Sequence, residues 1–414
     1  MTPKHPVATK RGLLLTRSPV TPAERSAEKR RIRKHQVLDC IRKEGPIARS
    51  AVARNLGFNL PTVSRLVDEL VDEGLAIEAQ AQKTPLGRRP IPVSLKTNAA
   101  CVMGIDLGKI TTIGLMMDLK GGVIARHENN TPPMDSPQRL ADWVAQVASE
   151  LLALAGGSIP PLAGAGVALP GLIHRPDRLA QTLAPDAQAV NDRLSSFLDV
   201  PVLVDNDTRM MAHGILWFGP PRNLETFAVV NIGHGLGMAL VIGRKVYPGF
   251  HGHAGEIGHI PLGEQGIRCY CGSSGCLENI ASGSGLERMA MQAGLTKNGG
   301  KAAWQDLAEM ARAGSADALA IFERFGHTLG RGLGAVSNLF NPQAIILAGR
   351  VVRASDLFIK PMFDEINTVV LPAIVQEVKI DVSELYEDAG PLGTCACVLQ
   401  HIFSAAHISV ESVV

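Results

Sequence analysis

Two glycine-bearing stretches with the same pattern constrain the fold of this chain most strongly. Residues 101–125, CVMGIDLGKITTIGLMMDLKGGVIA, indicate two apolar strands joined by a turn near Asp106 and Gly108. Residues 227–249, FAVVNIGHGLGMALVIGRKVYPG, repeat this pattern, and helix-like stretches follow each copy. The repetition predicts a duplicated α/β unit whose two halves enclose a cleft.

A third strand lies between the two copies. The segment VLVDND, residues 202–207, leads directly into the helical pattern TRMMAHGILWFG. Asn206 and Asp207 therefore fall at the carboxyl end of a strand. Open α/β sheets bind their ligands at that end, so we expect both side chains to face the cleft.

Length and composition place the chain among cytoplasmic globular proteins. Its 414 residues are 46% hydrophobic, which is enough for two or three domains with their own cores. No apolar run reaches the ~18 residues of a membrane span, and the basic N-terminus lacks the apolar core of a secretory signal. Seven cysteines in no regular framework argue against secreted disulfides.

The charge is distributed unevenly along the chain. Residues 1–100 contain 19 Lys and Arg against 9 Asp and Glu, whereas the remainder contains 22 against 30. A basic N-terminal part on an acidic body predicts that only the former meets a polyanion. Residues 1–30, which are rich in Pro, Ser and basic residues, are expected to form a disordered basic arm.

Helical patterns follow this arm. The first runs from His35 to Gly45, the second ends at Gly57, and the third, NLPTVSRLVDELVDEGL, begins at an Asn59 cap. Two helices joined by a tight turn fit the major groove of double-stranded DNA when the second begins with small polar and basic groups. The third pattern supplies such groups as candidate base contacts: Thr62, Ser64 and Arg65.

A hairpin follows the three helices. LAIEAQAQ and RPIPVSL indicate two short strands around KTPLGRR, which would form a wing with Arg88 and Arg89 at its tip. Arginines at this place can contact phosphates or the minor groove. Together with the charge distribution, the pattern predicts a winged helix-turn-helix that binds operator DNA.

A cysteine cluster, CYCGSSGCLE, stands in the acidic body. His259, Cys269, Cys271 and Cys276 supply one imidazole and three thiolates, a full tetrahedral set for structural Zn²⁺. Zinc on one ring nitrogen of His259 would orient the other toward a ligand. The alternative is a reduced glycine-rich loop with incidental thiols.

The motifs GVALPG, VLVDND, NIGHGLG, AGEIGH and CYCGSSGCLE occur in an order that resembles the ROK family of repressors and sugar kinases. TVSRLVDELVDEGL followed by GRRP resembles the winged helix of the family's repressors. The resemblance implies a winged helix-turn-helix domain at residues 31–97 and, at 98–414, a two-lobed α/β domain of the actin-like ATPase fold. It also implies a homodimer or a dimer of dimers.

The resemblance further implies a sugar site. The family residues that contact sugar hydroxyls match Asn206, Asp207, Glu256, His259 and Glu278. One position departs from the family pattern, because LAPDA has Asp186 where an asparagine that touches sugar is common. This departure indicates a different sugar or a different loop.

The motifs that bind the nucleotide in the family's kinases are altered further in this chain. Asp207 matches their general base, but DLGKIT replaces DxGGTK and GHGLG replaces GTGxG, while Ala348 and Arg350 stand where glycines are common. Isoleucine and imidazole offer phosphate and Mg²⁺ neither a hydroxyl nor an open backbone, which argues against ATP and Mg²⁺ as cofactors. The leading hypothesis is a repressor that responds to a sugar or sugar phosphate. An ATP-dependent sugar kinase with a DNA-binding head and a protein-interaction module remain as alternatives.

Overall fold

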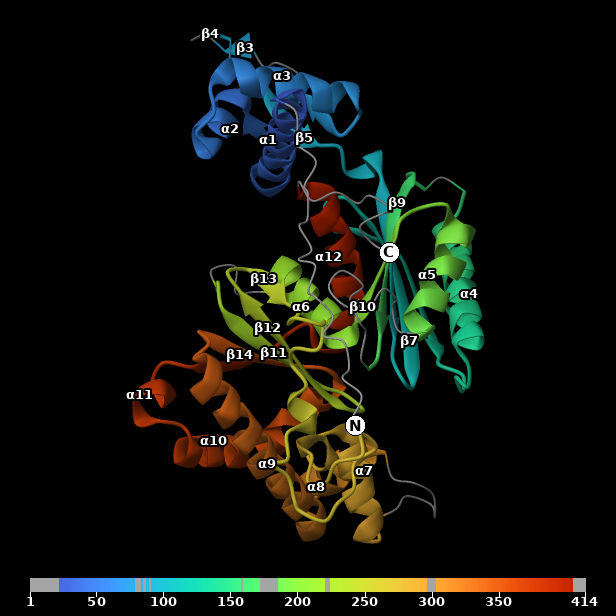
Figure 1. The fold of residues 1–414 in the computed structure, drawn as a ribbon, viewed down its shortest axis with the longest axis vertical. Coiled ribbons are helices and arrows are strands. Elements are labelled where there is room, and N and C mark those ends of the chain that lie inside the picture. Colours follow the sequence, from blue (N-terminus) through green and yellow to red (C-terminus); the bar gives the residue numbers. More distant parts are fainter. Residues whose placement is uncertain are drawn as a thin grey trace, which may run out of the picture. The chain divides into compact units, whose positions relative to one another are not determined.

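The computed structural model consists of two compact units (Figure 1). The first comprises the residues up to Leu95 together with Phe403 and Ser404, and the second begins at Lys96. It describes residues 22–78, 83–84, 87–88, 91–157, 159–171, 185–219, 224–295 and 303–404. Within these ranges, none of the helices combines the length and the apolar character that crossing a bilayer requires.

The N-terminal unit is a winged helix-turn-helix, as predicted. Its helices and strands are α1 (Pro22–Glu44), β1 (Ile47–Ala48), α2 (Arg49–Leu56), α3 (Leu60–Asp72), β2 (Ala76–Glu78), β3 (Lys83–Thr84), β4 (Gly87–Arg88) and β5 (Pro92–Leu95). Strands β1, β5 and β2 form one antiparallel sheet in that order, and β3 pairs with β4 in the wing.

The local signals for α2 and α3 are confirmed. The side chain of Asn59 caps α3 by accepting the Thr62 N–H at 2.9 Å, and Gly57 ends α2 with a φ of 66°. One face of α3 is buried in the core of this unit. It consists of Val63, Leu66, Val67 and Leu70.

Helix α1 begins earlier than predicted. It starts at Pro22 rather than His35, and so includes residues 22–30, which the sequence had assigned to the disordered arm. Ala, Glu, Lys and Arg are strong helix formers, and a Glu28–Arg31 ion pair of 2.7 Å at helical spacing adds to their propensity. Arg30 also pairs with Glu69 of α3, a contact between distant segments that composition cannot show.

The second unit contains two five-stranded sheets with the same topology. Counted in chain order, the first strand of each sheet pairs antiparallel with the second strand and parallel with the fourth. The predicted duplication is therefore confirmed. The first sheet has the order β10 (Val202–Asn206), β9 (Leu162–Leu169), β6 (Cys101–Leu107), β7 (Thr111–Asp118) and β8 (Val123–Asn130). The second has the order β13 (Lys245–Tyr247), β12 (Leu236–Ile242), β11 (Phe227–Ile232), β14 (Ala344–Ala348) and β15 (Lys379–Val382).

Each sheet has its own helical layer. Helices α4 (Pro137–Ala155) and α5 (Pro185–Leu198) share a core with the first sheet. The second sheet packs against α7 (Gly283–Gln292), α8 (Trp304–Arg312), α9 (Ala316–Phe340) and α10 (Ser355–Val369). Shorter helices are η1 (Thr97–Ala99), η2 (Ile257–His259), η3 (Leu277–Asn279), η4 (Arg350–Ala354), α11 (Pro372–Val375) and η5 (Tyr386–Asp388).

Two helices each pack against the sheet that they do not follow in the chain. Helix α6 (Asp207–Phe218) continues from β10 of the first sheet but packs against the second, while α12 (Ala389–Phe403) follows the second sheet in the chain (Figure 1). Helix α12 lies directly on the first sheet, because a Cβ atom at Gly104 would come within 2.1 Å of Thr394 Oγ1. The two helices meet at Gly214 and Gly393, where a Cβ atom on Gly214 would lie 2.9 Å from the Gly393 nitrogen. Glycine at both positions lets the backbones touch.

We expect Gly393→Ala to lower the free energy of unfolding by about 1–3 kcal/mol, because its methyl group would come within 1.8 Å of the Met210 carbonyl oxygen. Gly157→Ala is the matched control, since an added Cβ there meets no atom within 4 Å. Urea denaturation of the three proteins measures the difference. Equal midpoints for Gly393→Ala and wild type would show that the two helices are not in close contact.

Candidate functional site

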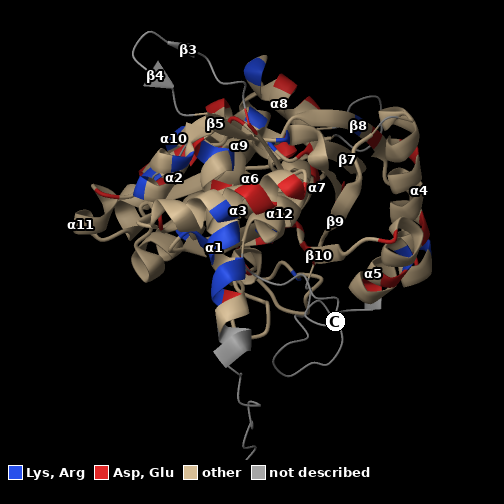
Figure 2. Cartoon of the chain, turned by 90° about the horizontal axis from the view of Figure 1, so that it is seen from above, with Lys and Arg blue, Asp and Glu red and all other residues tan. Residues whose placement is uncertain are grey.

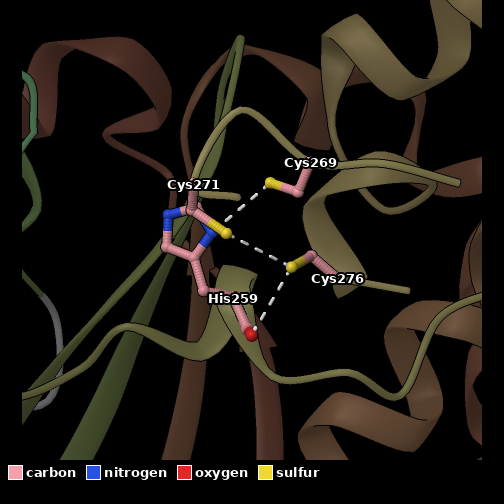
Figure 3. Close-up of side chains that lie close together, drawn as sticks. All are labelled: His259, Cys269, Cys271 and Cys276. Carbon is pink, nitrogen blue, oxygen red and sulfur yellow. Dashed lines mark hydrogen bonds between the residues drawn. The ribbon is translucent and has the colours of Figure 1, made fainter. Parts of the chain in front are cut away.

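The structure brings together the four predicted metal ligands (Figure 3). His259 ends η2, and the three cysteines follow in the segment that leads into η3. The ligand atoms of all four residues lie within 4.8 Å of one another. Two pairs are closer, with Cys269 Sγ 3.7 Å from His259 Nδ1 and Cys271 Sγ 3.7 Å from Cys276 Sγ.

These distances suit a tetrahedral metal site. Metal–sulfur bonds of about 2.3 Å place two sulfurs of a tetrahedron about 3.7 Å apart, which is the separation found between Cys271 and Cys276. Gly272 and Gly275 adopt φ values of 91° and 73°, conformations that turn the chain tightly between the cysteines. The cluster can therefore hold a metal ion.

The second ring nitrogen of His259 points away from the sulfurs. His259 Nε2 lies 3.2 Å from the hydroxyl oxygen of Tyr270. Glu278, which is part of η3, accepts the backbone N–H of Leu236 at 3.0 Å. Desolvation raises the pKa of Glu256, nearby Asp207 and Glu278 raise it further, and His259 and Arg209 oppose the rise. Three of the predicted sugar ligands thus come together beside the metal ligands.

Asn206 and Asp207 lie at the junction of β10 and α6. The Asn206 side chain is already engaged, because Oδ1 accepts the N–H groups of Thr208 and Arg209 at 3.0 and 3.1 Å while Nδ2 donates to the Gly171 carbonyl. Asp207 Oδ1 accepts the Thr208 N–H at 2.7 Å. Burial raises the pKa of Asp207, although these hydrogen bonds oppose the rise. A sugar contact of Asn206 would have to coexist with its role as helix cap.

Arg209 is a residue of this site that the sequence analysis missed. Its side chain is buried and donates to Asp205 through Nε at 2.8 Å, and Nη1 donates to the Gly252 carbonyl oxygen. The guanidinium therefore fixes the segment before Glu256 against the end of β10. The sequence offers no clear signal for this pair, because Asp205 lies in strand β10 whereas Arg209 lies in helix α6.

The departures from the kinase motifs lie around Asp106 and the turn that follows β6. Asp106 is paired within β6 rather than at the bend, which is formed by residues 108–110. Burial and repulsion from Asp207 raise the pKa of Asp106 to about 7, and Arg350 opposes this rise. Arg350 also donates to Thr111 Oγ1 at 3.1 Å. Burial and the charge of Lys109 lower the pKa of His234.

The predicted DNA contacts differ in exposure. The Arg65 side chain is 64% exposed, whereas Thr62 and Ser64 are half-buried. Arg88 belongs to β4, and Arg89 lies outside the described residues.

Asp186, the departure from the family's sugar loop, is exposed in the first turn of α5.

Arg49 stabilises helix α3, which carries the predicted base contacts. The sequence analysis did not identify this arginine. It donates to the Ser64 carbonyl at 3.0 Å and pairs with Asp68 and Glu78 at 2.6 and 2.8 Å, which joins α2, α3 and β2. Figure 2 shows basic residues along α1. Among them, Lys34 pairs with Glu73 and Arg42 pairs with Asp39. The positive charge of this unit is thus partly neutralised within it.

Comparison with known proteins identifies both units. The model of the ROK family matches residues 102–401, most of the chain. The protein belongs to the ROK family. A second model, winged helix-turn-helix DNA-binding, matches residues 30–76.

Relatives of this ROK protein align over nearly its full length. A xylose repressor of Bacillus spizizenii is 29% identical over 376 residues, which cover 90% of this chain and 96% of the relative. An N-acetylglucosamine repressor of Escherichia coli O6:H1 is 28% identical over 356 residues, covering 83% and 87%. The crystal structure of a ROK family transcriptional regulator, a homolog of the E. coli MLC protein, shares the fold with a TM-score of 0.78 at 24% identity, covering 93% of this chain and 99% of that one.

We expect purified protein to contain about one metal ion per chain, because the four ligand atoms match one tetrahedral site. Cys271→Ser should lose most of this metal and unfold at a lower temperature, since the polar loop depends on it. Cys40→Ala, which changes a cysteine of the N-terminal unit, is the control for general loss of a thiol. Elemental analysis of protein prepared without chelator that finds far less than one equivalent in the wild type would contradict the assignment.

Proposed function

We propose that the protein is a sugar-responsive DNA-binding transcriptional regulator that represses carbohydrate-metabolism genes. This proposal rests mainly on the presence of a winged helix-turn-helix and a ROK unit in the same chain. Proteins named xylose repressor and N-acetylglucosamine repressor align with 90% and 83% of this chain, which covers both units. We take residues 31–97 as the DNA-binding domain, residues 98–414 as the effector domain and residues 1–30 as a basic extension.

The DNA-binding role rests on α3. Its first turns present Arg65 to solvent beside Thr62 and Ser64, which places a cation and two hydroxyls where a recognition helix meets base edges. Arg88 and Arg89 of the wing would contact phosphates or the minor groove. A homodimer or dimer of dimers would match the symmetry of palindromic operators. A protein that reads chromosomal operators acts in the cytoplasm.

The effector is a sugar or a sugar phosphate. Glu256 and Glu278 would accept hydrogen bonds from sugar hydroxyls, and Nε2 of His259 would donate one. Asn206 and Asp207 would approach from the end of β10. A polyol needs such a set because each buried oxygen left unpaired costs about 1–3 kcal/mol.

The metal is structural Zn²⁺ held by His259, Cys269, Cys271 and Cys276. This ligand set has no open position, so the ion would supply no activated water and instead fix the loop. With Nδ1 of His259 bound to the ion, Nε2 carries the proton and faces the sugar site as a donor. The donor set and the sulfur–sulfur distance support zinc in this role.

A sugar kinase is the second candidate, and the retained Asp207 is the observation that favours it. Against it, the first glycine turn carries Lys109 and Ile110, the latter 56% exposed, and the second carries His234. These side chains are poor partners for phosphate-bound Mg²⁺, so ATP and Mg²⁺ are not among the proposed ligands. A coupled ADP-release assay with D-xylose and N-acetyl-D-glucosamine separates the two functions, because sustained turnover would favour the kinase.

We expect Arg65→Ala to weaken operator binding by about 1–3 kcal/mol and to relax preference at one base pair, because a base-reading contact is lost. Arg139→Ala is the matched control, since Arg139 is an exposed arginine of α4 whose ion pair is with Asp135. Binding sites selected from random DNA, followed by titration of each variant, give both quantities. If Arg139→Ala weakens binding as much as Arg65→Ala, the placement of α3 in the groove is wrong.

A further inference from the structure

Tyr270 reaches into the proposed sugar site from the cysteine loop. It stands between Cys269 and Cys271 in the sequence, and its ring lies edge-on to His259 with centroids 5.3 Å apart and planes at 82°. The loop beneath it is held by hydrogen bonds from the Cys269 N–H to the Ser273 carbonyl and from the Gly272 N–H to the Cys269 carbonyl, at 2.8 and 3.1 Å. The position of the side chain is therefore set by the same segment that supplies the metal ligands.

The Tyr270 hydroxyl makes the contacts expected of a sugar hydroxyl. Its oxygen is 3.2 Å from His259 Nε2, the nitrogen that carries a proton when Nδ1 faces the thiolates. Burial raises the pKa of Tyr270, and the carboxylates of Glu278 and Glu256 raise it further. The hydroxyl therefore lies between an imidazole that can donate to it and the carboxylate of Glu278, which can accept its proton. A second hydroxyl cannot take the same place while the phenol remains.

The rest of the Tyr270 side chain lies mostly in solvent. Tyr270 is 81% exposed, so rotation of the ring into solvent gives up little packing. Its attachment to the site is then mainly the interaction of the hydroxyl with His259 and with Glu278. A ligand that replaces both interactions can displace it, whereas a ligand that replaces only one leaves His259 or Glu278 unpaired.

We propose that Tyr270 is a specificity-determining residue that closes the sugar site when no effector is bound and must be displaced when a sugar enters. The inference rests on the proposed effector role of Glu256, His259 and Glu278. It adds that the ligand must offer a hydroxyl able both to accept from His259 and to donate to Glu278. A sugar lacking that hydroxyl is excluded by competition with the tyrosine.

The variant Tyr270→Phe tests this by removing the competing hydroxyl and keeping the ring. Calorimetric titration with D-xylose and with N-acetyl-D-glucosamine should give about tenfold tighter binding of the cognate sugar to Tyr270→Phe than to wild type. Tyr247→Phe, a change to a 46% exposed tyrosine of β13, should bind as wild type does. Metal content equal to that of wild type shows that the loop is intact.

A spectroscopic measurement distinguishes displacement of the Tyr270 side chain by the sugar from a direct contact between Tyr270 and the bound sugar. The chain has three tyrosines, so 3-fluorotyrosine gives three ¹⁹F resonances, and the one missing in Tyr270→Phe belongs to Tyr270. Saturating sugar should move this resonance toward the position of free 3-fluorotyrosine and leave the other two unchanged. Sugar binding with equal or weaker affinity in Tyr270→Phe and an unmoved resonance would overturn the inference alone. Failure of both sugars to bind any of the proteins would overturn the proposed effector role as well.

Discussion

The backbone contact between α6 and α12 at Gly214 and Gly393 is the constraint on which the second unit depends. Each helix follows one sheet in the chain and packs on the other, so the two halves of the duplication cannot rotate without sliding these helices past each other. Packed cores resist small deformations and favour discrete arrangements. Because α6 begins at Asp207, a ligand held there acts on one end of this crossed pair.

The other wall of the proposed sugar site depends on local chemistry rather than on a core. The segment from His259 to Cys276 is polar and glycine-rich, and turns at Gly272 and Gly275 bring its thiols together. Arg209 fixes the preceding segment through Gly252, and the expected zinc fixes the rest. His259 is part of both the metal site and the proposed sugar site, since one ring nitrogen faces the sulfurs and the other faces Tyr270.

Features encoded by short-range patterns could be predicted from the sequence. Strand alternation around glycine turns predicted the duplicated unit, and the Asn59 cap and Gly57 stop predicted the limits of α2 and α3. Features that depend on distant contacts could not. The Arg30–Glu69 pair beside the start of α1, the packing of α6 and α12, and the contacts of Arg49 with Asp68 and of Arg209 with Gly252 all join segments that are far apart in the chain. The sequence analysis did not identify Tyr270, because the direction of its side chain is set by the folded loop.

The central claim is that a sugar held by Glu256 and its neighbours controls binding of DNA. Titration of a selected operator with wild type and Glu256→Ala, each with and without saturating sugar, tests it most directly. The account predicts that sugar weakens operator binding by wild type about tenfold, which corresponds to about 1.4 kcal/mol of coupling, and that Glu256→Ala binds operator normally but does not respond. An equal response in both proteins would contradict the role of Glu256, and no response of wild type to any sugar would contradict the regulatory mechanism itself.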